Sequence, residues 1–187
     1  MANVFRNEVV LKGSDEAIAG FINKYFSVEQ DCKFIDFEKL LPLNGKEPSE
    51  VWHSDSDAFN FEIISAQSNI FVFRFDTKNC TPTAIFTEII KLKPDFKEII
   101  ITACCEHLSE IFKIEAKESL FITSLEWDGQ GKLSRKIIKK IATELWGYSK
   151  RPNLEEQGFI HIGGGQFMRM HFNMAGLADL YPRFKKS

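Results

Sequence analysis

The sequence predicts an α+β fold: a ferredoxin-like βαββαβ antiparallel sheet with two helices on one face, followed by a smaller C-terminal α+β extension. Three observations in the middle of the 187-residue chain predict this class. Residues 70–75 place three phenylalanines on one side of a period-two strand. Residues 81–93 carry an apolar stripe at helical spacing, and residues 98–104 form a run rich in β-branched side chains. A strand, a helix and a strand in this order indicate a sheet whose aromatic face is covered by helices.

The start of the chain supplies the first strand and helix of this unit. Residues 4–12 predict a strand that Gly13 ends, and Ser14 is a favourable N-cap for the helix that follows. The apolar stripe of that helix consists of Ile18, Phe21, Ile22, Tyr25 and Phe26. This spacing of three and four residues is typical of an amphipathic helix packed on a core.

Four further segments connect this helix to the central strand. Residues 34–37 predict a short inserted strand, residues 43–58 a polar loop or lid, residues 59–65 a strand, and residues 67–69 a turn. The resulting order of strands and helices predicts a four-stranded antiparallel sheet. Both helices should then bury their stripes against the phenylalanine face.

Short motifs within the first 105 residues form a recognisable set. The opening motif comprises Met1, Asn3, Asn7, Val9, Leu11 and Gly13. The second is Phe34-Ile35-Asp36-Phe37-Glu38-Lys39-Leu40-Leu41-Pro42, and the third consists of Phe75, Thr77 and Pro82, with Pro94 ending the next helix. In these positions the chain resembles the YubB-type ferredoxin-like proteins of conjugative plasmids and phages. The resemblance implies a ferredoxin-like fold and a mobile-element origin, and it implies no particular chemistry.

The rest of the chain predicts a second, smaller α+β unit, so we divide the sequence into domains at 1–109 and 110–187. Strands are expected at residues 112–116 and 120–127, and a helix at residues 133–146. The helix residues expected to face inward are Leu133, Ile137, Ile141 and Leu145, with Ser134 as the cap and Gly147 as the stop.

The last predicted element is a β-hairpin of residues 159–162 and 167–172, joined across a Gly163-Gly164-Gly165-Gln166 tip. The tip lacks the lysine and hydroxyl residue of a phosphate-binding loop. His161 and His171 flank it, and a hairpin brings them close enough to consider a histidine-dependent nuclease. The sequence designates no nucleophile and no orienting acceptor for either histidine.

The composition of the chain limits the classes of protein to which it can belong. The chain is 44% hydrophobic, contains 18 phenylalanines and has a net charge of −2. No apolar run approaches the roughly 18–20 residues that span a bilayer, and the N-terminus lacks the apolar core of a signal peptide, so we expect a cytoplasmic protein without membrane contact.

The four cysteines form no CxxC motif and are expected to be buried, reduced thiols. We expect no metal and no cofactor, and a weak metal site at His53, Asp55 and Asp57 is disfavoured.

Charge is distributed unevenly. Residues 1–109 contain 17 acidic and 11 basic side chains, and residues 110–187 contain 9 acidic and 13 basic ones. The candidate binding residues are five positive charges on the outside of one helix: Lys132, Arg135, Lys136, Lys139 and Lys140. They suit an acidic protein surface or nucleic-acid phosphates, and a solvated helix face explains them as well.

These observations favour a non-enzymatic accessory protein that binds another protein, such as a host or defence component. The first alternative is a nucleic-acid-binding protein that uses the basic helix. The second is a nuclease that depends on His161 or His171. The sequence does not define an oligomeric state.

Overall fold

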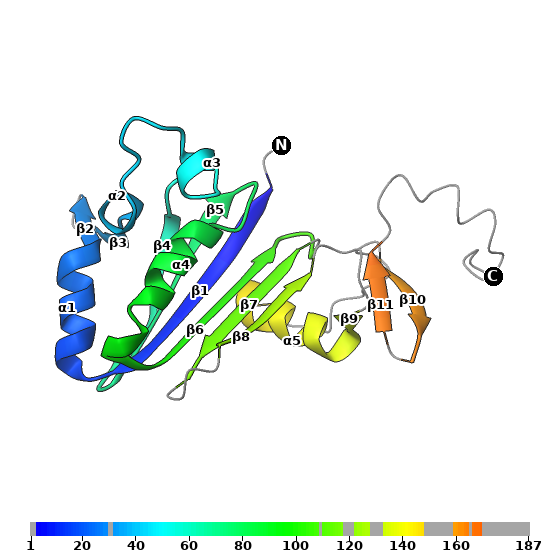
Figure 1. Ribbon diagram of the computed structural model, residues 1–187. Helices are drawn as coiled ribbons and strands as arrows, with labels where there is room; N and C mark the ends of the chain where they lie inside the picture. Colours follow the sequence, from blue (N-terminus) through cyan, green and yellow to red (C-terminus); the bar gives the residue numbers. More distant parts are fainter. Residues whose placement is uncertain are drawn as a thin grey trace.

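The structure is a computed structural model that describes residues 3–29, 32–108, 110–117, 122–127, 133–147, 159–164 and 166–169. Its centre is one sheet built from β1 (Val4–Gly13), β4 (Phe59–Gln67), β5 (Ile70–Lys78), β6 (Phe96–Cys105), β7 (Ile111–Ala116) and β8 (Ile122–Trp127). The strands lie in the order β4-β5-β1-β6-β7-β8, and every neighbouring pair is antiparallel (Figure 1). The predicted α+β class is therefore confirmed.

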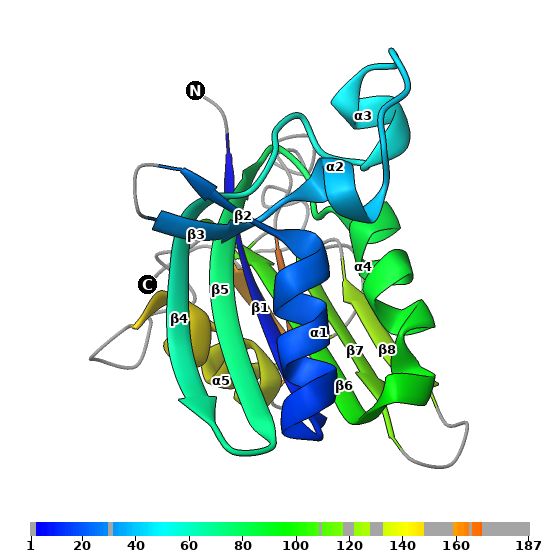
Figure 2. The same ribbon diagram turned by 90° about the vertical axis from the view of Figure 1, so that its left-hand side faces the viewer.

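Helices lie on both sides of this sheet. The helices α1 (Asp15–Tyr25) and α4 (Thr83–Lys91) cover one face, and α5 (Arg135–Trp146) lies on the other (Figure 2). The smaller elements are a hairpin of β2 (Phe26–Glu29) and β3 (Cys32–Ile35), the short helices α2 (Phe37–Leu40), α3 (Pro48–Val51) and η1 (Lys93–Asp95), and a three-stranded sheet of β10 (Phe159–Gly163), β11 (Gln166–Arg169) and β9 (Leu133–Ser134). The predicted hairpin around Gly163 is present as the β10–β11 pair.

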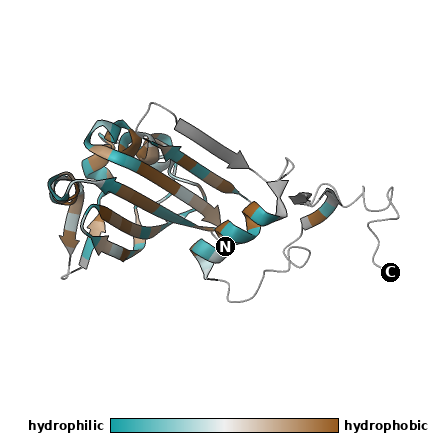
Figure 3. Ribbon diagram, turned by 90° about the horizontal axis from the view of Figure 1, so that it is seen from below, coloured by the Kyte–Doolittle hydropathy of each residue, from teal (hydrophilic) through white to brown (hydrophobic). Residues whose placement is uncertain are grey.

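Strict alternation along β1 gives the main sheet two different faces. Phe5, Val9 and Leu11 are fully buried beneath α1 and α4, whereas Arg6 and Lys12 point to the opposite side. Figure 3 shows hydrophobic and hydrophilic residues alternating along the strands. We call the two sides the helix face and the charged face.

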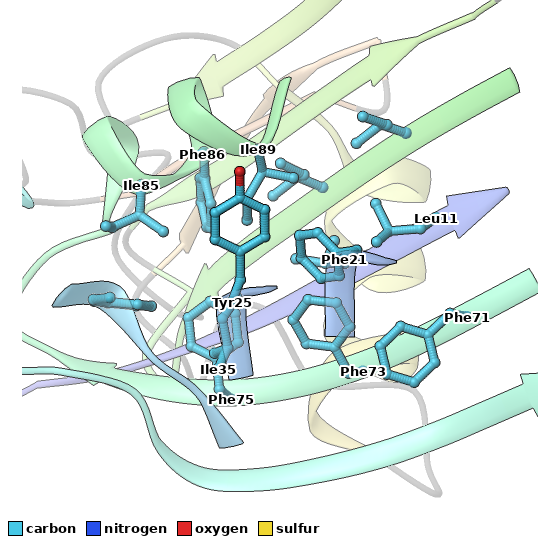
Figure 4. Packing of buried hydrophobic residues seen from close by; sticks show 14 of the residues in the cluster. Leu11, Phe21, Tyr25, Ile35, Phe71, Phe73, Phe75, Ile85, Phe86 and Ile89 are labelled. Atoms are coloured by element: carbon cyan, nitrogen blue, oxygen red, sulfur yellow. The ribbon is translucent and has the colours of Figure 1, made fainter. Parts of the chain in front are cut away.

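The core lies between the helix face and the two helices. Phe71, Phe73 and Phe75 are buried there, as predicted, and the ring of Phe73 stands 6.1 Å from that of Phe21 on α1 and 5.6 Å from that of Phe26 (Figure 4). Close contacts between so many aromatic rings bury a large apolar area in a small domain.

Local capping positions the first helix as the sequence predicts. The Oγ atom of Ser14 accepts a hydrogen bond from the backbone N–H of Ala17 at 3.2 Å. Asp15 and Glu16 occupy the first turn, where negative charge is favourable. The helix ends at Tyr25, and Phe26 begins β2 instead of extending the apolar stripe.

The segment predicted as a polar loop or lid, residues 43–58, is attached to the core. It contains α3, and the side chain of Trp52 is 5% exposed. The indole Nε1–H donates a hydrogen bond of 2.7 Å to the carbonyl oxygen of Leu41, and the rings of Trp52 and Phe37 lie 5.4 Å apart. A buried, hydrogen-bonded tryptophan makes this segment a structural part of the domain.

The predicted four-stranded sheet is too small, because β7 and β8 extend the main sheet to six strands. We expected both strands in a separate unit beyond residue 109. Instead β7 pairs with β6 in a register that places Ile114 beside Ile101 and Ala116 beside Ile99. This pairing extends the helix face, so the domain boundary predicted at 109/110 falls inside one continuous sheet.

The inward face of α5 also differs from the prediction. The buried residues are Ile138, Ile141, Ala142 and Leu145, while Ile137 is 38% exposed. Ile141 and Leu145 therefore face inward as predicted. Leu133 belongs to β9 and the helix begins at Arg135, so Ile138 and Ala142 take the places expected for Leu133 and Ile137. Gly147 ends the helix as predicted, with a φ of 63° and an N–H bonded to the carbonyl of Thr143.

We predict that Phe73→Ala lowers the free energy of unfolding by about 3–5 kcal/mol, because it leaves a cavity among packed rings. Chemical denaturation followed by circular dichroism measures the change. Val72→Ala on the half-buried charged face is the matched control, with an expected loss of about 1 kcal/mol. A loss below about 1 kcal/mol for Phe73→Ala would show that these rings do not hold the core together.

Candidate functional site

The basic helix α5 is held on the charged face of the sheet by a second apolar cluster. Its members are Cys104, Leu108, Ile111, Ile138, Ile141, Ala142 and Leu145, with Trp146 at the edge. Leu108 reaches this cluster from a turn in which its φ is 54°. Positive φ is unfavourable for a leucine, so burial of its side chain supports the turn.

Two arginines of the charged face contact the last turn of α5. The guanidinium of Arg6 lies 4.4 Å from the centre of the Trp146 ring, and the Nη2 group of Arg74 donates a 2.7 Å hydrogen bond to the carbonyl oxygen of Glu144. Trp146 in turn donates from Nε1 to the carbonyl oxygen of Cys104 at 3.3 Å. A cation at a helix C-terminus satisfies carbonyls that have no partner within the helix.

Each of these arginines is fixed by a carboxylate on a neighbouring strand. Arg6 bonds Asp76 through Nε at 3.0 Å and through Nη2 at 3.1 Å, and this contact raises the pKa of Arg6. Asp76 also accepts a hydrogen bond from Asn60. Arg74 bonds Glu8 from Nε at 2.7 Å. The bidentate Arg6–Asp76 pair and the Arg74–Glu8 pair fix the directions of both arginines and thereby define where α5 lies.

The candidate binding residues are only partly brought together. Lys136 and Lys140 are exposed on successive turns of α5, Lys139 is half-buried, and the ammonium of Lys140 lies 3.8 Å from the carboxylate of Glu144. Arg135 is the first helical residue, and its side chain lies outside the described part of the structure, as does all of Lys132. The helix therefore presents positive charge to solvent on the side opposite its apolar face.

Five charged residues beyond α5 on the same face are paired with one another. Lys12 bonds Glu98 at 2.5 Å, and Lys113 bonds Glu115 at 2.5 Å, while Lys117 lies within 3.5 Å of both carboxylates. The bonds from Lys12 and Lys113 lower the pKa values of Glu98 and Glu115, respectively. Three lysines share two carboxylates in this arrangement, so it offers a polyanion one net positive charge. The phenylalanines that resemble an RNA-stacking row are buried on the opposite face.

The histidines do not form a catalytic arrangement within the described residues. His53 contacts the Thr83 hydroxyl oxygen through Nδ1 at 2.8 Å, and Asp55 accepts a hydrogen bond from Asn79. His161 is exposed on β10 opposite Phe167, and His171 lies outside the described residues. Over the ranges that the structure describes, no group of three or more histidine, cysteine or acidic side chains is placed to hold a metal ion.

The cysteines differ in exposure. Cys104 and Cys105 are buried free thiols, whereas Cys80 is exposed, which corrects the expectation that all are buried. Cys80 follows the end of β5, where the chain turns toward α4 at the surface. Burial raises the pKa of the Cys104 thiol well above its usual range, and partial burial raises that of Cys80 to a smaller extent. The side chain of Cys32 lies outside the described part.

Sequence reasoning missed the exposed apolar side chains at one border of the sheet. Val28 on β2 is 63% exposed, and Ile63 and Ile64 on β4 are 46% and 40% exposed. β4 is the first strand in the sheet order, so its outer side has no strand neighbour in the described structure. The alternation of Phe59–Gln67 indicates a strand, but a border position depends on strand order, which the sequence does not display.

Comparison of the chain with protein-family models, with curated protein sequences and with solved structures gives no match. None of the helices in the described residues combines the length and the apolar character that a membrane crossing requires. The geometry of this chain is therefore the basis for a functional proposal.

We predict that iodoacetamide modifies Cys80 in the folded protein at mildly alkaline pH, while Cys104 and Cys105 react only after unfolding, because the reagent does not reach buried thiols. Intact-mass and peptide-mass measurements locate the adducts. Cys80→Ser is the control that assigns the fast site. Equal rates at Cys80 and Cys104 in the native protein would contradict the described packing.

Proposed function

We propose that this chain is a non-enzymatic protein-binding module. The supporting observation is the border formed by β4 and the β2–β3 hairpin, which we call the β4 border. It carries Val28, Ile63 and Ile64, three of the four large apolar side chains that are exposed in the described structure. A strand with an unpaired outer backbone and apolar neighbours is a recurrent protein-recognition surface.

The two parts of the β4 border adjoin each other. β3 contacts β4, and the ring of Phe26 at the start of the hairpin packs edge-on against Phe61 of β4, with centres 5.4 Å apart. Apolar side chains gathered on adjoining elements bury more area with one partner than scattered ones do. The border is thus better suited to a protein surface than to a small solute.

We place the framework of this module among ferredoxin-like folds, enlarged by β7 and β8. The support is the chain order β1-α1-β4-β5-α4-β6 together with the neighbour order β4-β5-β1-β6. The elements between α1 and β4 are then insertions. The resemblance to YubB-type proteins in the first 105 residues is the reason to seek the partner in a host or defence system that meets a plasmid or phage.

A second candidate function is nucleic-acid binding by α5. The observation in its favour is the exposure of Lys136 and Lys140 one turn apart. Opposing it are the paired charges on the adjoining sheet face and the excess of acidic side chains in residues 1–109. We therefore assign the basic helix to an acidic protein surface, where its charges accelerate association.

We predict no submicromolar binding of RNA or single-stranded DNA at physiological salt. Fluorescence anisotropy with labelled oligonucleotides over a salt series measures it, with Lys136→Glu/Lys140→Glu as the charge-reversed comparison. The second candidate function would be established instead by tight binding whose log affinity falls linearly with log salt concentration, with a slope of about 0.7–0.9 for each phosphate contacted.

We predict that Ile63→Asp abolishes capture of the partner from the native host, because a desolvated carboxylate opposes burial of the border. Affinity capture followed by mass spectrometry compares it with the wild type. Thr87→Asp is the control: that residue is exposed on α4, a helix to which the proposal gives no binding role. Equal loss in both variants, or retention in Ile63→Asp, would remove the β4 border from the proposal.

A further inference from the structure

We propose that the β4 border receives an extended segment of a partner protein, which adds to the sheet as a seventh strand beneath the β2–β3 hairpin. This inference rests on the proposed protein-binding function and specifies how the partner binds. The partner segment carries alternating apolar and basic residues. Four features of the border support it: the position of the hairpin, the exposed apolar pair, the charge of Glu62 and the bulges of β4.

The hairpin projects beyond the last strand of the sheet. It follows α1 on the helix face and crosses the end of β4. The end of β2 and the start of β3 lie past that strand (Figure 2). Phe26 anchors it, with ring centres 5.4 Å from Phe61 and 6.0 Å from Phe71. The projecting part therefore covers space beside the sheet that no described strand occupies.

The covered space is lined by Val28 and Ile63, two of the three exposed apolar residues of the β4 border. Side chains alternate along a strand, so Val28 lies on the same side of the hairpin as Phe26, which faces the sheet. Ile63 pairs with Phe73 and so belongs to the helix face, where it is 46% exposed. A strand beside β4 would bring its own helix-face side chains between Val28 and Ile63.

The opposite side of the same strand position is acidic. Glu62 pairs with Arg74 in the register, which places its side chain on the charged face. Arg74 is already bonded to the carboxylate of Glu8 and to the backbone carbonyl oxygen of Glu144. Glu62 forms no ion pair within the described residues, and its charge adds to the effect of Asp76 in raising the pKa of Arg6. A lysine or arginine on the partner strand, pointing to the charged face, would complement Glu62. On the helix face the requirement differs. Lys33 pairs with Val28 on the hairpin and is exposed, so its positive charge disfavours basic residues on that side of the partner strand and leaves apolar ones preferred.

Two bulges limit the added strand to a short segment. The register of β4 against β5 shifts between Phe59 and Glu62 and again between Ile63 and Ser65. Bulges twist an edge and prevent long, indiscriminate pairing. Affinity must then come from side chains at the border in addition to a few backbone hydrogen bonds, which gives the site selectivity.

A second copy of this chain is a poorer occupant. Antiparallel pairing of two β4 strands about Glu62 would place the two Glu62 carboxylates directly opposite each other on the charged face, and pairing about Ile63 would leave them diagonal neighbours on it. Like charges in that position are unfavourable. A foreign segment with basic residues at the corresponding positions meets no such repulsion.

The test uses the full chain and a synthetic acetylated peptide of about six residues, a typical strand length, that alternates valine and lysine. Isothermal calorimetry compares it with a valine–glutamate peptide and with a valine–lysine peptide interrupted by proline, which removes a backbone donor. We expect the valine–lysine peptide to bind most tightly. Glu62→Gln should remove most of its advantage over the glutamate peptide, and Val28→Asp should weaken it by roughly tenfold or more.

Hydrogen exchange then reports the mode of binding. Strand addition should slow exchange of amides in β4 while leaving α5 unchanged. Binding without protection in β4, equal binding of the proline peptide, or unchanged affinity in Val28→Asp would overturn the strand-addition proposal. Self-association of the peptide-free protein that Glu62→Gln strengthens would indicate a second copy as the occupant.

Failure of this proposal is distinguishable from failure of the proposed function. If Ile63→Asp abolishes capture of the native partner but no alternating peptide protects β4, the border binds protein by side-chain contacts alone. If Ile63→Asp retains the native partner, the border is not the binding surface and both proposals fall. Thermal unfolding of each variant confirms that the fold is intact.

Discussion

The central strand β1 pairs along almost its entire length with β5 on one side and β6 on the other, and its alternation admits a single register. A shift by one residue would bring Arg6 and Lys12 under α1 and α4 and place Phe5 and Leu11 against the ion pairs. Asn7 adds a polar constraint inside the core, because its Nδ2 group donates to the carbonyls of Phe5 and Phe75 and to the hydroxyl of Thr77. Every other element takes its position from the two faces that this register creates.

The charged face shows how electrostatics and packing combine to place α5. The helix buries four residues, against two on α1 and three on α4, and the arginine contacts to its last turn add to this packing in orienting it. These arginines are held by Asp76 and Glu8, whose positions follow from the β1–β5 register. The basic surface of α5 is therefore oriented by the same strand pairing that orders the core.

Local signals were sufficient for much of this fold. The Ser14 cap, the buried phenylalanines of β5 and the Gly147 stop each depend on residues close in sequence, and all were predicted. Features that depend on distant partners were not. Phe26 continues the helical spacing but pairs with Ile35, and β7 joins the main sheet because β6 offers it a matching apolar row. The inward face of α5 was predicted correctly at Ile141 and Leu145 but not at Leu133, which pairs with Phe167 in a strand instead of opening the helix.

The same distinction explains why the basic helix was identified from sequence and the β4 border was not. Clustered lysines are visible in one segment, whereas identifying the border requires knowing that the described strands extend the sheet on the β6 side and not beyond β4. A hairpin turn carries the chain from β6 into β7 and β8, and this connection is short. On the other side the β2–β3 hairpin contacts β4 through side chains, in a sheet of its own. The outer backbone groups of β4 consequently lack a strand partner within the described chain. An added strand from another protein would satisfy them and cover Val28 and Ile63 in one step.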